Sequence, residues 1–166
     1  MKEDHGERQE FAALVQAHSR ALFRAARALL DSDAAAEDAV GEAVLLAWQA
    51  FPRLRRRESA RAWLLKITVN CAYDQRRRAR PTVPLEEAAC AAAPAQEPLG
   101  LWELVQALPE EQRLAVTLYY YDGLSVREIA QVLGAPQGTV KSRLSRGRDK
   151  LRERLREEGI DRKSVV

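Results

Sequence analysis

The sequence predicts an all-α protein made of two small helical domains joined by a flexible linker. Its 166 residues suffice for one ordinary domain or two small ones. Apolar residues recur at helical spacing (i, i+3, i+4, i+7) both before residue 80 and after residue 100. Between them, residues 81–100 hold four prolines and many alanines without helical periodicity, which indicates a linker. We therefore place one domain at 1–80 and the other at 101–166.

The first predicted helix covers residues 8–30, where apolar side chains at helical spacing run from Phe11 to Leu29. His18 lies on this apolar face, so we interpret it as a packed histidine rather than a ligand. The sequence DSD ends the helix, and Asp33 is expected to cap the next one.

The second predicted helix, residues 34–50, has an apolar side and a mixed side. The residues expected to be buried are Ala36, Val40, Ala43, Val44 and Ala47. Another side carries Asp38, Glu42, Leu45 and Trp48. An exposed tryptophan beside acids would indicate a partner surface. The same pattern equally fits Trp48 as ordinary core.

A third predicted helix, residues 60–78, carries the chemistry best suited to nucleic acid in the first domain. It follows the arginine-rich loop RLRRRES, and Ser59 is expected to cap it. One stripe is apolar and consists of Trp63, Leu64, Ile67 and Cys71. The other stripe consists of Lys66, Asn70, Tyr73 and Arg77. In such a stripe the cationic side chains can bind phosphates, the amide can hydrogen-bond to base edges, and the aromatic ring can stack on an unpaired base. The alternative is a polar outer face with a half-buried Tyr73.

The second domain is predicted to contain two helices followed by a helix-turn-helix. The segments that form them are LWELVQAL, PEEQRLAVTLYYYDG, SVREIAQVL and QGTVKSRLSRGRDKLRERL. The residues expected to mark their boundaries are Pro109, Gly123, Ser125 as a cap, Gly134 as a turn, and Pro136 or Gln137 as the start of the last helix.

Within the helix-turn-helix, the apolar residues predict how the two helices face each other. Ile129, Ala130 and Leu133 are expected to face Val140 and Leu144. The N-terminal half of the second helix then offers polar and cationic side chains to solvent, where such helices meet base edges and phosphates in the major groove. These side chains are Gln137, Thr139, Lys141, Ser142, Arg143, Ser145 and Arg146. The cations that follow alternate with acids and fit an ion-paired, solvated helix end.

Charge is unevenly distributed along the chain, although the formal net charge is only +3. Residues 53–80 carry 10 basic and 2 acidic side chains, and residues 141–166 carry 10 and 5. Two separated basic blocks suggest two contacts with a polyanion such as nucleic acid, and a solvated surface is the alternative. Fully extended, the linker reaches about 65–70 Å. This is comparable with the length of about twenty base-pair steps of a DNA duplex, at about 3.4 Å each.

Several other classes of protein are disfavoured. The N-terminal sequence MKEDHGERQEF lacks the apolar stretch of a signal peptide, and no apolar run approaches bilayer length, so we expect a cytoplasmic protein without membrane insertion. Cys71 and Cys90 form no CxxC pair and lie far in sequence from His5 and His18, so we expect no metal or cofactor. No paired carboxylates, and no nucleophile with a base, stand at workable spacing, so we expect no enzyme.

These segments resemble the extracytoplasmic-function (ECF) sigma factors of bacterial RNA polymerase, in particular the sigma-E-like group. LPEEQRLAVTLYYYDGLSVREIAQVLGAPQGTVKSRLSRGRDKLR resembles the family's region 4, which reads the minus-thirty-five promoter element. AEDAVGEAVLLAW, residues 36–48, resembles region 2.2, which docks on the coiled coil of the polymerase β′ subunit. ARAWLLKITVNCAYDQRRR, residues 60–78, resembles regions 2.3 and 2.4, which read and melt the minus-ten element.

The resemblance implies three sets of site residues. Candidate polymerase contacts are Asp38, Glu42, Leu45 and Trp48. Candidate minus-ten contacts are Arg56, Arg57, Arg61, Lys66, Asn70, Tyr73 and Arg77. Candidate minus-thirty-five contacts are Arg127, Gln137, Thr139, Lys141, Ser142, Arg143, Ser145 and Arg146, with Arg127 and Lys141 on phosphates. The sequence departs from the family pattern at Gly41, Ala43 and Val44, on the docking face.

The resemblance also implies partners. These are the polymerase core, through its β′ coiled coil and β flap, double- and single-stranded promoter DNA, and an anti-sigma factor that holds the protein inactive until a stress signal. The alternative function is a free-standing helix-turn-helix repressor. Such a repressor would bind duplex DNA tightly without polymerase.

Overall fold

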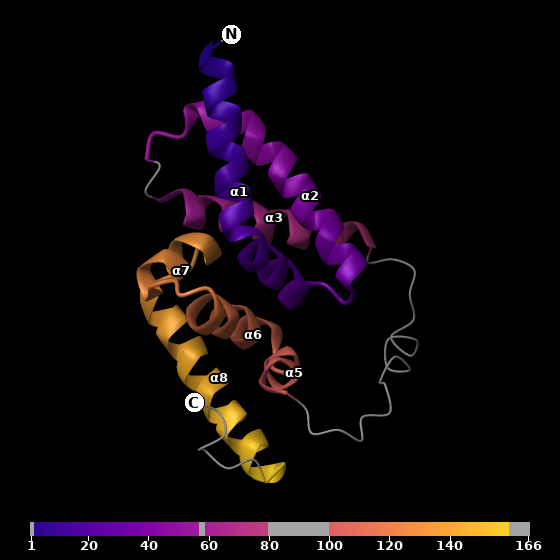
Figure 1. Ribbon diagram of the computed structural model, residues 1–166. Helices are drawn as coiled ribbons and strands as arrows, with labels where there is room; N and C mark the ends of the chain where they lie inside the picture. Colours follow the sequence, from indigo (N-terminus) through magenta and orange to yellow (C-terminus); the bar gives the residue numbers. More distant parts are fainter. Residues whose placement is uncertain (1, 57–58, 80–99, 160–166) are drawn as a thin grey trace.

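The computed structural model describes residues 2–56, 59–79 and 100–159, which form two helical bundles (Figure 1). The first bundle contains α1 (Lys2–Leu29), α2 (Asp33–Ala50), a 3₁₀ turn (Phe51–Arg53) and α3 (Ala60–Ala79). The second contains α5 (Leu101–Gln106), α6 (Glu110–Val116), a π-helical turn (Thr117–Tyr121), α7 (Val126–Leu133) and α8 (Gln137–Glu157). These ranges hold no strand, so the predicted all-α fold of two small helical domains is confirmed. The predicted linker lies outside the described residues, apart from Gly100.

The first two helices differ from prediction at their starts. α1 begins at Lys2 rather than near residue 8, because residues 2–7 add nothing to the apolar stripe from which the start was predicted. Ser32, not Asp33, caps α2, since the Ser32 hydroxyl accepts a hydrogen bond from the Ala35 N–H at 3.1 Å. Asp33 is instead the first helical residue and pairs with Arg27 at 3.0 Å.

Small residues dominate the buried side of α2. Its buried residues are Ala36, Ala39, Ala43 and Ala47. Val40 and Val44, which the sequence predicts to be buried, are only half-buried. Alanines at this spacing allow α1 and α3 to approach α2 closely, which turns the larger valines to the edges of the contact.

The second bundle depends on a close approach between α6 and α8. Gly147 of α8 is buried at this contact, and a Cβ atom added to it would lie 2.7 Å from Val116 Cγ2. After α6 the π-helical turn runs to Tyr121, and Gly123 leaves the helix with a φ of 69°. The predicted stop at Gly123 is therefore confirmed, because a positive φ favours glycine.

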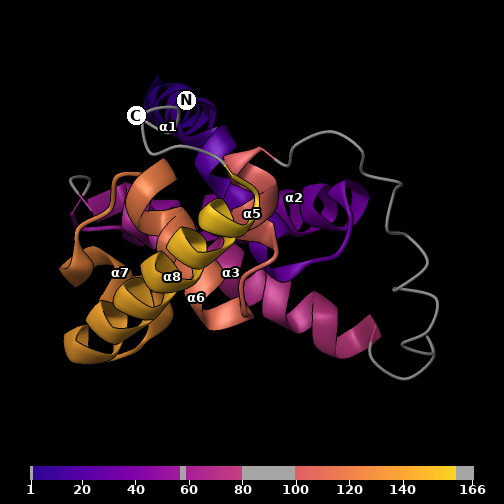
Figure 2. The same ribbon diagram turned by 90° about the horizontal axis from the view of Figure 1, so that it is seen from below.

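The two bundles pack against each other. α7 contacts α3, while α6 and the π-helical turn contact α1. Figures 1 and 2 show the second bundle along the underside of the first, with α6 and α7 toward α1 and α3. Buried apolar side chains form one hydrophobic cluster that continues across both bundles. Residues far apart in sequence therefore meet at the interface between them.

Candidate nucleic-acid interface

α7 and α8 form the predicted helix-turn-helix. The Ser125 hydroxyl accepts from the Glu128 N–H, and the Glu128 carboxylate accepts from the Ser125 N–H, both at 3.1 Å. This reciprocal capping box fixes the start of α7. Gly134 ends α7 with a φ of 62°, and α8 begins at Gln137 directly after Pro136. The predicted cap, turn and helix start are confirmed.

The residues predicted to line the seam between these helices differ in how deeply they are buried. Ile129, Val140 and Leu144 are buried, as expected. Ala130 and Leu133 are half-buried and pack against the hydrophobic cluster, and Val132, which the sequence prediction did not name, is buried as well. Val132 follows Ile129 by three positions, so the two side chains lie on the same face of the short helix.

The N-terminal half of α8 exposes most of the side chains predicted to read DNA. Those exposed are Gln137, Lys141, Ser142, Ser145 and Arg146 on α8, together with Arg127 on α7. Thr139 is half-buried. Arg143 is not freely offered to solvent as predicted: it is half-buried and pairs with Glu111 at 3.6 Å. The reason is tertiary, because α6 packs against α8 and places Glu111 within reach.

The predicted single-strand surface on α3 is partly accessible. Lys66 and Asn70 are exposed, and so is Arg56 in the preceding loop. Arg77 is exposed and pairs locally with Asp74 at 2.9 Å. Arg57 lies outside the described residues. A cation and an amide therefore stand free on one side of this helix.

Two members of the same set are turned toward the second bundle. Arg61 donates to the Glu128 carboxylate and to the Asp122 backbone carbonyl, each at 3.3 Å. Tyr73 is half-buried, with the Arg76 guanidinium 5.2 Å from its ring centroid. Burial raises the pKa of the Tyr73 hydroxyl. The half-buried alternative for Tyr73 is thus the arrangement found.

The exposed surface of α2 is apolar as well as acidic. Asp38 is exposed, while Glu42 is half-buried and pairs with Arg78 of α3 at 3.0 Å. Leu45 and its neighbour Leu46 are 66% and 46% exposed, and the sequence interpretation missed Leu46. Two large apolar side chains that follow each other in sequence are therefore exposed on this helix.

Trp48 is half-buried and packs into an aromatic cluster. Its ring centroid lies 5.2 Å from that of Phe11 and 6.4 Å from that of Phe51. Trp63 extends the cluster, 6.4 Å from Phe51. Of the two interpretations left open for Trp48, the structure favours core packing, because α1 and the 3₁₀ turn bring their rings against α2.

A buried ion pair joins the bundles, and sequence reasoning missed it. Arg24 of α1 donates to one carboxylate oxygen of Asp122 through Nε at 3.0 Å and through Nη2 at 2.7 Å. The Asp122 side chain has no exposed surface, and its burial raises the carboxyl pKa to about 6 even though the Arg24 hydrogen bonds oppose the rise. The partners lie 98 residues apart, so no periodic pattern could indicate the pair.

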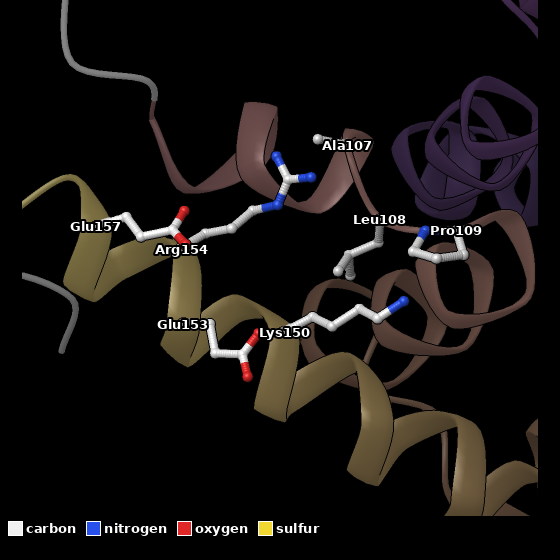
Figure 3. A pocket seen from close by; sticks show the side chains of 7 residues that line it. All are labelled: Ala107, Leu108, Pro109, Lys150, Glu153, Arg154 and Glu157. Atoms are coloured by element: carbon white, nitrogen blue, oxygen red, sulfur yellow. The ribbon is translucent and has the colours of Figure 1, made fainter.

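Two hollows flank the second bundle. An apolar groove of about 450 Å³ is lined chiefly by Leu101, Val105, Tyr120, Leu151 and Leu155. A charged hollow of about 630 Å³ lies between the C-terminal half of α8 and residues 107–109. There Lys150 and Arg154 extend toward that segment, and Glu153 and Glu157 lie beside them on α8 (Figure 3). Alternating charges at this end of α8 agree with the predicted solvated helix end.

Burial shifts the pKa values of two further titratable residues, Cys71 and His18. Cys71 is buried, which raises its thiol pKa to about 11. His18 is half-buried, and burial lowers its pKa, which agrees with a packed histidine. No three His, Cys, Asp or Glu side chains gather into a metal-binding group among the described residues. Across the same ranges, no helix combines the length and apolarity needed to cross a membrane.

Two family descriptions match separate parts of the chain. "Sigma-70 region 2" matches residues 14–82, and "Sigma-70, region 4" matches residues 99–151. The two matched segments correspond to the two helical bundles. The first holds the α3 surface, and the second holds the helix-turn-helix.

Curated relatives and solved structures agree with these matches. The ECF RNA polymerase sigma factor SigM of Mycobacterium tuberculosis is 36% identical over 151 residues, covering 88% of this chain and 77% of the relative. SigL of the same organism is 35% identical, covering 90% and 91%. The sigma factor RpoE from Bartonella quintana, solved with the anti-sigma factor NepR, matches with a TM-score of 0.70 at 30% identity, covering 93% of this chain and 98% of that one. The polar α8 surface, the α3 surface and these relationships have one common explanation: the chain belongs to the extracytoplasmic-function sigma factors of bacterial RNA polymerase.

Proposed function

We propose that this protein binds the core of RNA polymerase in the cytoplasm and directs it to promoters. Residues 1–80 and 101–166 would be its two functional domains. The observation that carries the proposal is the exposed, polar and cationic N-terminal half of α8 within a helix-turn-helix. A second polar surface lies on α3, in the other bundle.

The two surfaces suit different forms of DNA. An intact minus-thirty-five duplex requires only a helix that enters the major groove, and α8 offers Ser142 and Arg146 for base edges with Lys141 for phosphate. The Ser142 hydroxyl donates to the Gly138 carbonyl at 3.1 Å, which leaves its lone pairs free to accept from a base amine. A melted minus-ten strand requires cations and groups that hold unstacked bases, for which α3 offers Lys66 and Asn70.

Two further surfaces would serve protein partners. The exposed pair Leu45 and Leu46, together with exposed Asp38 on the same helix, is suited to the β′ coiled coil of polymerase. The apolar groove between α5 and α8 is suited to the β flap. Relatives solved with anti-sigma factors support an anti-sigma partner for this chain as well. When polymerase holds both bundles, binding of one DNA-contacting surface to a promoter raises the effective concentration of the other surface there.

The test is run-off transcription with purified bacterial core polymerase on a genomic fragment library, with and without the protein. New discrete starts that share two upstream boxes are expected. Arg146→Ala together with Ser142→Ala should abolish those starts without reducing polymerase binding. The matched control Arg154→Ala removes a cation from the charged hollow of the same helix and should leave the starts unchanged. Asn70→Ala should reduce permanganate reactivity of the minus-ten thymines more than it reduces duplex binding.

The outcomes separate the sigma factor from a repressor. No new starts, combined with tight binding of the protein alone to duplex DNA, would support a free-standing repressor. Unchanged starts in the α8 double variant would show that this helix does not read the promoter. Normal melting with Asn70→Ala would remove α3 from the minus-ten role.

A further inference from the structure

We infer that residues 160–166 of this chain fold back after α8 and cover the apolar groove between α5 and α8. This docking needs no sigma-factor activity, so it stands apart from the proposed function. Only its consequence for polymerase rests on that function, because the same groove is proposed for the β flap. The lining of the groove, the geometry at the end of α8 and the reach of the segment support the inference.

The groove offers apolar side chains that remain accessible. Leu101 and Tyr120 on its lining are 39% and 51% exposed. Leu151 and Leu155 of α8 are half-buried and complete the lining on the other side of its volume of about 450 Å³. Apolar side chains that line a groove and stay exposed mark an interaction site.

The end of α8 turns the chain toward this groove. Gly159 has a φ of 67°, and its N–H donates to the Arg156 carbonyl at 3.2 Å. A left-handed glycine directly after a helix, bonded to the carbonyl three residues earlier, is the arrangement of a Schellman cap. In such a cap the residue after the glycine commonly makes an apolar contact with the residue five positions before it. Here these two residues are Ile160 and Leu155, and Leu155 lines the groove.

The segment is long enough to cover the groove from end to end. Along α8 the lining runs from Leu155 back to Arg148, seven positions or about 10.5 Å of helix. Residues 160–166 span up to about 20 Å when extended. The valine pair at 165–166 therefore reaches the far end of the groove, where Arg148 donates to the Tyr120 hydroxyl at 3.4 Å.

The composition of the segment suits this position. Its apolar side chains stand at its two ends, and its charged side chains, Asp161, Arg162 and Lys163, lie between them. With both ends on the groove, the charged middle can remain in water, where ionised groups avoid the cost of desolvation. The apolar ends then act as two anchors for one short bridge.

Coverage of the groove reduces the affinity of any partner that needs it uncovered. Few apolar side chains are buried and several residues lose conformational freedom, so coverage is incomplete. At a coverage of about 80%, the apparent affinity of such a partner falls about fivefold. The β flap, if it uses this groove, must displace the segment first.

Gly159 allows a test that redirects the chain without altering the groove. Gly159→Val disfavours the positive φ because valine is β-branched, whereas Gly159→Asn tolerates it. Among the described residues, no heavy atom lies within 4 Å of a Cβ added there, so neither side chain meets an obstacle. The two variants therefore differ in the direction of the following chain.

A second pair of variants acts on the segment itself. Ile160→Ser with Val165→Ser and Val166→Ser removes the apolar anchors and keeps length and charge. Its control, Arg162→Lys with Lys163→Arg, keeps length, charge and anchors.

The first measurement is fluorescence titration of the full-length proteins with 1-anilinonaphthalene-8-sulfonate, a dye that binds exposed apolar surface. Gly159→Val and the serine variant should bind the dye about fivefold more tightly than the wild type. Gly159→Asn and the control with exchanged cations should match the wild type. Tyr120→Ala, added to the serine variant, should cancel the gain, because Tyr120 lines the groove.

The second measurement observes the contact directly by methyl NMR. The chain has three isoleucines, at positions 67, 129 and 160, so the Ile160 δ1-methyl resonance is readily assigned. Nuclear Overhauser effects from this methyl group to Leu155 or Leu151 are expected in the wild type and in Gly159→Asn. They should be lost in Gly159→Val.

The inference is overturned if Ile160 shows no such effect in the wild type, or if the serine variant binds the dye no better than its control. Run-off transcription by the wild type tests the sigma function separately. New starts without the contact would refute docking alone, and the contact without new starts would refute the sigma function alone. Tighter binding of Gly159→Val than of Gly159→Asn to core polymerase would support competition with the flap, and equal binding would refute it.

Discussion

Gly147→Ala tests whether α6 and α8 approach as closely as the structure has them. Gly147 is buried in α8, and an added methyl group would lie 2.7 Å from Val116 Cγ2 and 3.6 Å from Gln112 Cβ. Val116 is only 2% exposed, and as a β-branched residue it is stiff at χ1, so it cannot turn away without moving its neighbours. Gly41→Ala is the matched control, because nothing lies within 4 Å of the corresponding position on the exposed side of α2.

The expected magnitudes follow from two opposing terms. Replacing a glycine in a helix interior by alanine stabilises the helix by about 1 kcal/mol, and this gain applies at both positions. Overpacking against Val116 costs about 1–3 kcal/mol and applies only at Gly147. Gly41→Ala should therefore raise the free energy of unfolding by about 1 kcal/mol, whereas Gly147→Ala should lower it by up to about 2 kcal/mol.

Urea unfolding followed by helical circular dichroism measures both changes. A double-mutant cycle with Val116→Ala isolates the contact, because the smaller side chain makes room for the new methyl group. Gly147→Ala should be less destabilising in that background by about 1 kcal/mol or more. If Gly147→Ala stabilises the protein as much as Gly41→Ala does, or if the cycle shows no coupling, the close approach at Gly147 is refuted.

Two further predictions concern α7 and the buried carboxylate. Ser125→Ala should lower the free energy of unfolding by about 1 kcal/mol because the Glu128 N–H loses its acceptor, and Ser125→Asp should retain most of the stability; equal stability of the two variants in urea would contradict the capping role. The folded-state pKa of Asp122, about 6, lies above the ordinary 3.8, so between about pH 4 and 6 the folded protein binds a proton that the unfolded chain releases. The stability of the wild type relative to Asp122→Asn should accordingly fall by up to about 3 kcal/mol as pH rises through that window. A pH-independent difference in urea unfolding, or a carboxyl that titrates near pH 4 by NMR, would show that Asp122 is not buried as described.

The helices, and the caps and turns at their ends, are determined by the local sequence. Ser125 with Glu128, Gly134 and the residues that start α8 were predictable, because a cap, a turn and a helix start depend on side chains within a few positions of one another. The polar N-terminal half of α8 followed from the same short-range pattern. The resemblance to the ECF sigma factors, which the comparisons confirm, rested on these motifs at their spacing.

Helical periodicity could not predict which of the polar side chains are accessible to DNA. Arg143 and Tyr73 carry the right chemistry, yet both are half-buried: α6 places Glu111 beside Arg143, and Arg76 of α3 lies over the Tyr73 ring. Trp48 fitted either surface or core until Phe11 and Phe51 were brought against it.

Only the tertiary structure decided how the two bundles meet. Arg24 and Asp122 stand 98 residues apart, and neither carries a local signal that points to the other. Helical spacing reports which side of one helix is apolar, since that depends on neighbours three and four positions away. The partner of a charge is set by where two separately folded bundles come into contact, and that is a property of the assembled chain.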